Sequence, residues 1–165
     1  MKIDAKFVAT VLKKRHDDSA WIFATEVSTS SGFDCQHSNG PGGIRRIDAF
    51  AMAIWPSKNF QRVAYEIKIA RSDWLAEIET PMKRVQAWYL SNEFWFAVAE
   101  NVMKPEDWRE DMAGCGLLVI HKDGSVKNIR KARCRKHTFP MPSGFIVSLL
   151  RCVRDQDWKD SKMGY

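Results

Sequence analysis

Residues 61–70, QRVAYEIKIA, follow residues 44–55, IRRIDAFAMAIW, after a short turn, and these two stretches decide the fold. Stretch 61–70 alternates as a β-strand does, since successive side chains of a strand point to opposite faces. One face carries Val63, Tyr65, Ile67 and Ile69, and the other carries Ala64, Glu66 and Lys68. Stretch 44–55 is mostly apolar on both faces, the pattern of a central strand that is covered on both sides. We therefore expect two consecutive strands, joined by the turn at 56–59, inside a sheet.

The segments around these strands predict helices and further strands. Apolar positions at helical spacing predict a helix over 4–15 with Asp4 as its N-cap. The other expected helices are a short one capped by Ser72 or Asp73, one over 81–91 that begins at Pro81, and one over 144–158. The other expected strands are 20–27, 93–98, and a hairpin of 116–121 and 125–132 around the turn Asp123-Gly124. This order predicts an α/β fold, a central mixed β-sheet flanked by α-helices, in a single domain over residues 1–165.

The chain of 165 residues has no apolar run of the 18 or more residues that cross a bilayer. No long apolar segment follows the N-terminus as in a signal peptide, so we expect a cytoplasmic protein without a membrane partner. The four cysteines (Cys35, Cys115, Cys134 and Cys152) are widely spaced, and free thiols are expected. Cys134 and His137 have the spacing of zinc ligands, but no second pair accompanies them, so zinc is not favoured.

The net charge of +6 comes from one segment, residues 121–137. Seven basic residues face a single acid there, and the remaining 19 basic and 19 acidic residues cancel. The basic residues are Lys122, Lys127, Arg130, Lys131, Arg133, Arg135 and Lys136, and the acid is Asp123. Such a patch attracts polyanions, nucleic acid first, although a solvated basic hairpin without a partner has the same composition.

Three residues carry the candidate chemistry. Asp48 interrupts an otherwise apolar strand, where a carboxylate is costly unless an ion pair, a hydrogen bond or a metal compensates it. Glu66 and Lys68 leave the next strand from one face. If the two strands are neighbours, two carboxylates and an ammonium converge, and a divalent cation would relieve the repulsion between the carboxylates. That set suits phosphodiester hydrolysis, whereas an ordinary surface ion pair would explain Glu66 and Lys68 alone.

The string Arg46-Ile47-Asp48, followed after seventeen residues by Glu66-Ile67-Lys68, resembles the D…(E/D)xK motif of the PD-(D/E)XK nucleases. Ile47 stands where that family usually has proline. Residues 65–98 also look like a phage and bacterial subgroup in which an R-S-D turn, a helix and an aromatic strand follow ExK. The resemblance implies a restriction-endonuclease-like core and a bacterial or phage-infected host cell.

The resemblance also implies roles for single residues. Asp48, Glu66, the Ile67 carbonyl and the upstream acid Glu26 would hold Mg2+, with Mn2+ able to substitute, and Lys68 would position the attacking water. Gln86, with Tyr89 three residues on, resembles a Q-and-Tyr motif of one branch, although that branch usually spaces the two residues by four. Either Gln86 or Lys83 could touch the scissile phosphate, and a solvated helix face is the alternative for both. Contacts to the DNA backbone are expected from Arg45, Arg46, Lys83 and the basic stretch 127–136, chiefly Lys127, Arg130, Lys131 and Arg133.

Further expectations and alternatives stay open at this point. Within the long loop 28–43, the glycine-rich segment 38–43 is expected to be a mobile flap beside the site that could contact DNA. Trp74 or Trp88 could stack on a base. DNA is the expected partner, and the protein could form a homodimer. The first rival function is a non-catalytic nucleic-acid-binding module on the same fold. The second is a hydrolase or interaction protein unrelated to nucleic acid, with the basic stretch facing an acidic protein.

Overall fold

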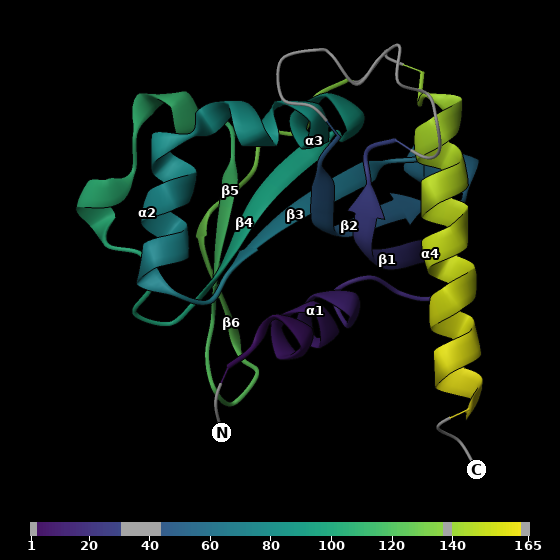
Figure 1. Ribbon diagram of the computed structural model, residues 1–165, viewed down its shortest axis with the longest axis horizontal. Helices are drawn as coiled ribbons and strands as arrows, with labels where there is room; N and C mark the ends of the chain where they lie inside the picture. Colours follow the sequence, from purple (N-terminus) through teal and green to yellow (C-terminus); the bar gives the residue numbers. More distant parts are fainter. Residues whose placement is uncertain (1–2, 31–43, 137–139, 163–165) are drawn as a thin grey trace.

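The computed structural model describes residues 3–30, 44–136 and 140–162, with the main chain alone over 157–162. Its centre is a six-stranded sheet in the order β1-β2-β3-β4-β5-β6 (Figure 1). The strands are β1 (Trp21–Ser28), β2 (Arg46–Ala53), β3 (Arg62–Lys68), β4 (Glu93–Ala99), β5 (Gly116–Ile120) and β6 (Val126–Arg130). The α-helices are α1 (Ala5–Lys13), α2 (Arg71–Glu79), α3 (Val85–Leu90) and α4 (Ser143–Lys162). Short 3-10 turns are η1 (Pro56–Lys58), η2 (Pro81–Arg84), η3 (Pro105–Asp107) and η4 (Glu110–Met112).

The sheet is mixed, which confirms the predicted α/β class. Strands β3, β4 and β5 run parallel, while β1–β2, β2–β3 and β5–β6 are antiparallel pairs. The chain leaves β3 through α2, η2 and α3 before it enters β4, because parallel neighbours need a crossover connection. The hairpin at the other end turns at Gly124, whose φ of +82° suits a glycine.

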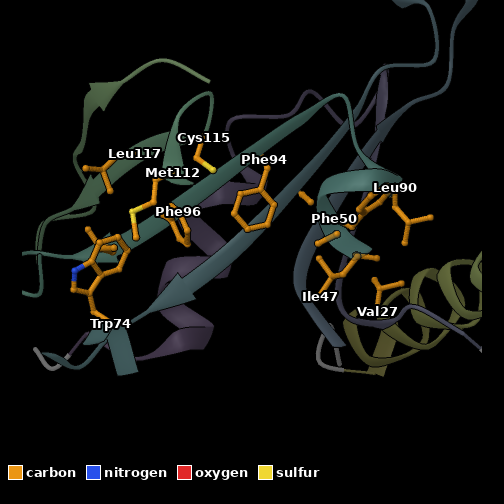
Figure 2. Packing of buried hydrophobic residues seen from close by; sticks show 14 of the residues in the cluster. Val27, Ile47, Phe50, Trp74, Leu90, Phe94, Phe96, Met112, Cys115 and Leu117 are labelled. Atoms are coloured by element: carbon orange, nitrogen blue, oxygen red, sulfur yellow. The ribbon is translucent and has the colours of Figure 1, made fainter. Parts of the chain in front are cut away.

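Helices cover both faces of the sheet, and each face has its own apolar core. Helices α2, α3 and α4 contribute Trp74, Ile78, Leu90 and Phe145 to the core over one face (Figure 2). Helix α1 closes the opposite face with Val8, Val11 and Leu12. Alternation along β3 divides its side chains between the two cores, with Ala64 in the first and Val63 and Tyr65 in the second. The face that carries Ala64 is therefore also the face of Glu66 and Lys68.

The helix starts show one correct and one wrong prediction. Asp4 is the N-cap of α1, and its carboxylate accepts a 2.7 Å hydrogen bond from the Phe7 N–H. Helix α2 begins earlier than expected, with Ala70 as its N-cap and no side-chain cap, so neither Ser72 nor Asp73 caps it. Its first residue, Arg71, instead pairs with Asp107 of η3. This ion pair attaches the start of α2 to the loop beyond β4, and the hydrogen bonds from Arg71 hold the pKa of Asp107 well below its usual range.

Two further expectations concern the chain as a whole. Within the described part of the chain, no helix is long and apolar enough to span a membrane. The predicted flap over 38–43 lies outside the described residues.

Candidate active site

Asp48 and Glu66 lie opposite each other on neighbouring strands. The antiparallel register pairs Phe50 with Ala64 and Ala49 with Tyr65, so the next position along brings Asp48 to the level of Glu66. Asp48 Oδ2 accepts a 2.7 Å hydrogen bond from the main-chain N–H of Ile67. Both side chains leave the sheet on the face covered by α2, because paired residues of adjacent strands share a face.

Burial raises the pKa of both carboxyl groups. Desolvation is the main cause for Asp48, whose pKa stays above its usual value although the Ile67 hydrogen bond and the Lys68 charge oppose the shift. Desolvation, followed by the charge of Asp48, raises the pKa of Glu66 to about 7. The charge of Asp48 thus makes Glu66 harder to ionise, as expected for two acids in one poorly solvated place. The site carries excess negative charge that a cation would stabilise.

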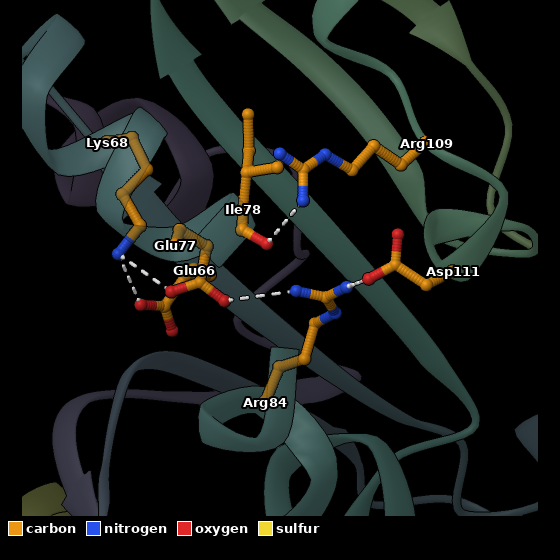
Figure 3. A network of polar contacts seen from close by, with 7 residues as sticks. All are labelled: Glu66, Lys68, Glu77, Ile78, Arg84, Arg109 and Asp111. Atoms are coloured by element: carbon orange, nitrogen blue, oxygen red, sulfur yellow. Dashed lines mark hydrogen bonds and ion pairs between the residues drawn. The ribbon is translucent and has the colours of Figure 1, made fainter. Parts of the chain in front are cut away.

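Lys68 supplies one positive charge at this point. Its ammonium lies 2.7 Å from Glu66 Oε1 and 3.3 Å from Glu77 Oε2 (Figure 3). Burial alone would lower the pKa of Lys68, but the charges of Glu66, Glu77 and Asp48 raise it above the usual lysine value. Lys68 is therefore protonated at neutral pH and serves as a donor and a fixed charge.

The network continues from Glu77 to Arg84 and Asp111. Glu77 Oε1 lies 3.5 Å from Arg84 NH1, and the other end of the guanidinium pairs with Asp111 (Figure 3). Glu77 and Arg84 are both buried, and Arg84 also lies over the Phe96 ring, 5.7 Å from its centroid. Alternating charges thus connect β3, α2, η2 and η4.

Glu77 and Arg84 were missed by the sequence analysis. A signal was present for Glu77: Trp74, Glu77 and Ile78 have i, i+3, i+4 spacing, and all three are buried in α2. A carboxylate on the buried stripe of a helix needs a partner of opposite charge. Arg84 had no comparable signal, because it lies among Met82, Lys83 and Val85 in a 3-10 turn.

Glu26, the expected upstream acid, lies on β1 opposite Asp48 of β2, but its side chain does not join the ion-pair network. The β1–β2 register pairs Thr25 with Ala49 and Val27 with Ile47, which leaves Glu26 opposite Asp48. Its φ of 57° is left-handed, a strained conformation for a non-glycine residue. The exposed carboxylate pairs with Arg46 NH1 at 3.2 Å, yet its charge still contributes to raising the pKa of Asp48.

The donor atoms at this place fit a hard divalent cation. Asp48 and Glu66 offer carboxylate oxygens and Ile67 a main-chain carbonyl, which are the ligand types that Mg2+ takes. Their raised pKa values give a cation a reason to bind, since it would compensate the charge that burial disfavours. In the described part of the chain, no three His, Cys, Asp or Glu side chains already form a metal-binding cluster. A bound ion would accordingly need water or phosphate oxygens to complete its coordination.

The other residues expected near the site divide into partly buried and exposed ones. Gln86 is partly buried on α3, while Lys83 is exposed on η2. The idea that Trp74 stacks on a base is wrong. Its ring is fully buried, and the indole N–H donates a 3.1 Å hydrogen bond to Asp107.

The expected DNA-binding residues are exposed. They are Arg45 and Arg46 at the start of β2, Lys127 and Arg130 on β6, and Lys131 and Arg133 just after β6. The guanidinium of Arg130 lies over the Trp108 ring, 4.8 Å from its centroid. Strand register pairs Glu66 with Phe96, Phe96 with Leu117, and Leu117 with Arg130, so Glu66 and Arg130 share one row across the sheet. Three strand spacings separate them, roughly 14 Å.

One member of the basic stretch is a structural residue. Arg135 donates hydrogen bonds of 2.8, 3.0 and 3.3 Å to the carbonyls of Trp88, Ser91 and Asn92, at the end of α3. Its guanidinium also stacks 3.6 Å from the centroid of the Trp88 ring. These carbonyls end a helix and lack intrahelical donors, so an arginine satisfies them well. Within the stretch 127–136 that is expected to hold DNA, this residue therefore has a structural role.

The expectation of free thiols is confirmed for the three cysteines that the structure describes. Cys115, Cys134 and Cys152 are free thiols, while Cys35 lies outside the described residues. His137, the other half of the weak zinc pair, also lies outside them.

Comparison with family models, curated proteins and solved structures finds no match to this chain.

Proposed function

We propose that this protein is a divalent-metal-dependent DNA nuclease of the PD-(D/E)XK type, which hydrolyses phosphodiester bonds as an endonuclease. One observation carries the proposal: Asp48 and Glu66 meet across two central strands beside Lys68, in surroundings that raise the pKa of both acids. Buried acids with perturbed pKa values and a specific charge partner are typical of functional sites.

Each residue then has a defined task. Asp48, Glu66 and the Ile67 carbonyl would hold Mg2+ or Mn2+, and Glu26, opposite Asp48 on β1, is proposed to assist once its carboxylate turns from Arg46. The bound ion would polarise the phosphate and acidify a water molecule. Lys68, held in its charged form by Glu66 and Glu77, would orient the attacking water and stabilise the charge that develops on the phosphate. Gln86 and Lys83 are proposed to contact the scissile phosphate.

Exposed cations support DNA as the substrate. Arg45 and Arg46 lie at the start of the strand that carries Asp48, and Arg130 lies on the same row and face as Glu66. Lys127, Lys131 and Arg133 extend this positive surface. Contacts of this kind bind the backbone without distinguishing sequence, so recognition of DNA structure is proposed. Action in the cytoplasm of a bacterial or phage-infected cell and assembly as a homodimer are also proposals.

A second candidate function follows from the ion pairs of Lys68. Its ammonium already compensates Glu66 and Glu77, so the network can exist for stability alone. The protein would then bind nucleic acid through its basic surface and cut nothing. The two functions differ in their response to metal.

A cleavage assay tests the proposal. Wild-type protein, Glu66→Gln and Lys68→Met are incubated with labelled single-stranded, duplex, flap and four-way-junction DNA in Mg2+, Mn2+ or EDTA. The nuclease predicts cutting that requires metal and is lost in both variants. It also predicts that Mg2+ raises the melting temperature of the wild type but not that of Glu66→Gln, since a ligand of the native state stabilises it. Binding without cutting, and no thermal effect of either metal, would establish the binding module instead.

A further inference from the structure

A cleft of about 240 Å3 opens next to the ion-pair network, between α3 and η4. Met82, Val85, Trp88 and Tyr89 form its apolar wall. They follow one another at the i, i+3, i+4 spacing of a helix face, so η2 and α3 present them as one stripe. Arg84 and Asp111 line the same cleft with their ion pair.

The wall of the cleft is unusually exposed for its composition. Tyr89 is 54% exposed and Met82 is 49% exposed, although both are large hydrophobic side chains. Exposed aromatic and apolar side chains that line a concavity indicate a binding surface more often than isolated ones do. A volume of about 240 Å3 is below the 300–1,000 Å3 typical of drug-sized ligands, so the cleft suits a single ring system.

Positively charged side chains near the cleft indicate what kind of ligand would contain that ring. A Cβ at Gly114 would lie 3.3 Å from Trp88 Cη2 and 3.7 Å from Arg133 Cβ, so the Trp88 ring and the exposed Arg133 both lie next to Gly114, the residue after Ala113 of the cleft. Lys83 is exposed on η2, one residue from Met82 and Arg84. An apolar and aromatic cleft with cations at its edge matches a base attached to a phosphate backbone, which stacks on aromatic rings while the phosphates meet the charges.

The cleft is also coupled to the proposed cutting site. Arg84 reaches from the cleft to Glu77, and Glu77 reaches Lys68, at 3.5 and 3.3 Å. One buried carboxylate therefore separates the cation in the cleft from the cation beside Glu66.

We propose that this cleft receives one unpaired base of a single-stranded DNA segment, with Tyr89 as a stacking residue and Arg133 and Lys83 as phosphate contacts. The inference rests on the proposed function for its choice of DNA. A duplex would have to unstack and extrude a base to use the cleft, so single strands, flaps and junctions, whose bases are already unpaired, are favoured over plain duplex.

The test is a binding measurement in EDTA, where no cutting occurs. Fluorescence anisotropy gives the affinities of wild type, Tyr89→Leu and Tyr89→Phe for a thymidine oligonucleotide and for an abasic oligonucleotide of equal length. The leucine keeps apolar bulk but removes the ring, and the phenylalanine keeps the ring. The matched control is Phe60→Leu, because Phe60 is 48% exposed in the β2–β3 turn and does not line the cleft.

Stacking predicts that wild type binds the thymidine chain about 5- to 100-fold more tightly than the abasic chain. Tyr89→Leu should lose most of that ratio without changing abasic binding, while Tyr89→Phe and Phe60→Leu should keep it. A wild type that binds both chains equally, or a Tyr89→Leu that binds as wild type does, overturns the inference.

The outcome is separate from that of the cleavage assay. If the stacking pattern appears but no metal supports cutting, the cleft stands and the nuclease proposal fails. If metal-dependent cutting occurs but the base makes no difference to binding, the nuclease stands and the cleft inference fails.

Discussion

The main-chain N–H of Ile67 donates a 2.7 Å hydrogen bond to Oδ2 of Asp48, across the boundary between β2 and β3. The bond favours the ionised form of the Asp48 carboxyl group, which burial disfavours. It also directs this carboxylate toward Ile67, the residue after Glu66 on β3. The regular pairing of β2 with β3 ends at Ala49 and Tyr65. Just beyond this pair, the Asp48 side chain accepts the hydrogen bond of the Ile67 main-chain N–H. The proposed site begins at this break in the pairing.

Replacement of Asp48 should separate the roles of its charge and its hydrogen bond. Asp48→Asn retains an oxygen that accepts from Ile67 and removes a charge that repels Glu66, so its free energy of unfolding should equal or exceed that of wild type. Asp48→Ala should lie about 1–2 kcal/mol below Asp48→Asn in urea denaturation, because it leaves the Ile67 N–H without this acceptor. Both should reduce metal-dependent cleavage by at least ~100-fold, since even the partners of metal ligands are worth 10- to 100-fold. Cleavage by Asp48→Asn at the wild-type rate would remove Asp48 from the site.

The pKa of Glu66 predicts a stability difference that depends on pH. Burial and Asp48 raise this pKa from 4.5 to about 7, so between these values the folded protein holds a proton that the unfolded chain has released. Stability from this group therefore falls as pH rises through that window. Glu66→Gln imitates the protonated form. Its free energy of unfolding should be close to that of the wild type at pH 4 and higher than that of the wild type at pH 8, by at most about 3 kcal/mol.

Comparing the two proteins at each pH removes the opposite trend of His16. Burial, with the Arg15 charge, lowers the pKa of His16 to about 4, so its contribution to stability grows from about pH 4 up to the ordinary histidine value of 6.5. That change is common to both proteins and cancels in the difference. A wild type that is the more stable protein at pH 8 would show that the Lys68 ion pair outweighs desolvation of Glu66.

Glu77 should be a major determinant of stability, and Glu79 on the same helix offers a matched control. The Glu77 side chain is 2% exposed and shared by Lys68 and Arg84, whereas Glu79 is 71% exposed and pairs with Arg109. Glu77→Gln should cost about 3 kcal/mol, because two buried cations each lose one partner and keep another. Glu79→Gln should cost at most about 1 kcal/mol. Equal effects in chemical denaturation would contradict the central place of Glu77.

Two neighbouring arginines should behave differently when each is replaced by alanine. Arg135→Ala should lower the free energy of unfolding by about 2–3 kcal/mol, because the carbonyls at the end of α3 lose a charged donor. Arg133→Ala should leave unfolding within ~0.5 kcal/mol but weaken DNA binding and reduce its salt slope by about 1. Denaturation and a salt series of binding isotherms measure the two effects. If Arg135→Ala weakened DNA binding without loss of stability, its structural role would be wrong.

Local patterns were sufficient to predict the sheet and the centre of the candidate site. Alternation with a period of two assigns Glu66 and Lys68 to one face, and a short turn between two strands brings Asp48 alongside them. The N-cap Asp4 and the turn at Gly124 were likewise set by neighbouring residues. The missed start of α2 shows the limit of such rules, since a pair between Arg71 and the distant Asp107 holds that helix end in place of a capping side chain.

The sequence by itself determined which residues share a strand, a face or a turn, because those relations depend on backbone geometry over a few residues. Only the tertiary structure decided which charges are buried together. Glu77 meets Lys68 because α2 packs over β3, and Arg84 meets Asp111 because η2 packs against η4. Arg135 became a helix-end partner, unlike its exposed neighbours, because the chain after β6 returns to α3. Desolvation and pairing depend on segments far apart along the chain, and no local period encodes them.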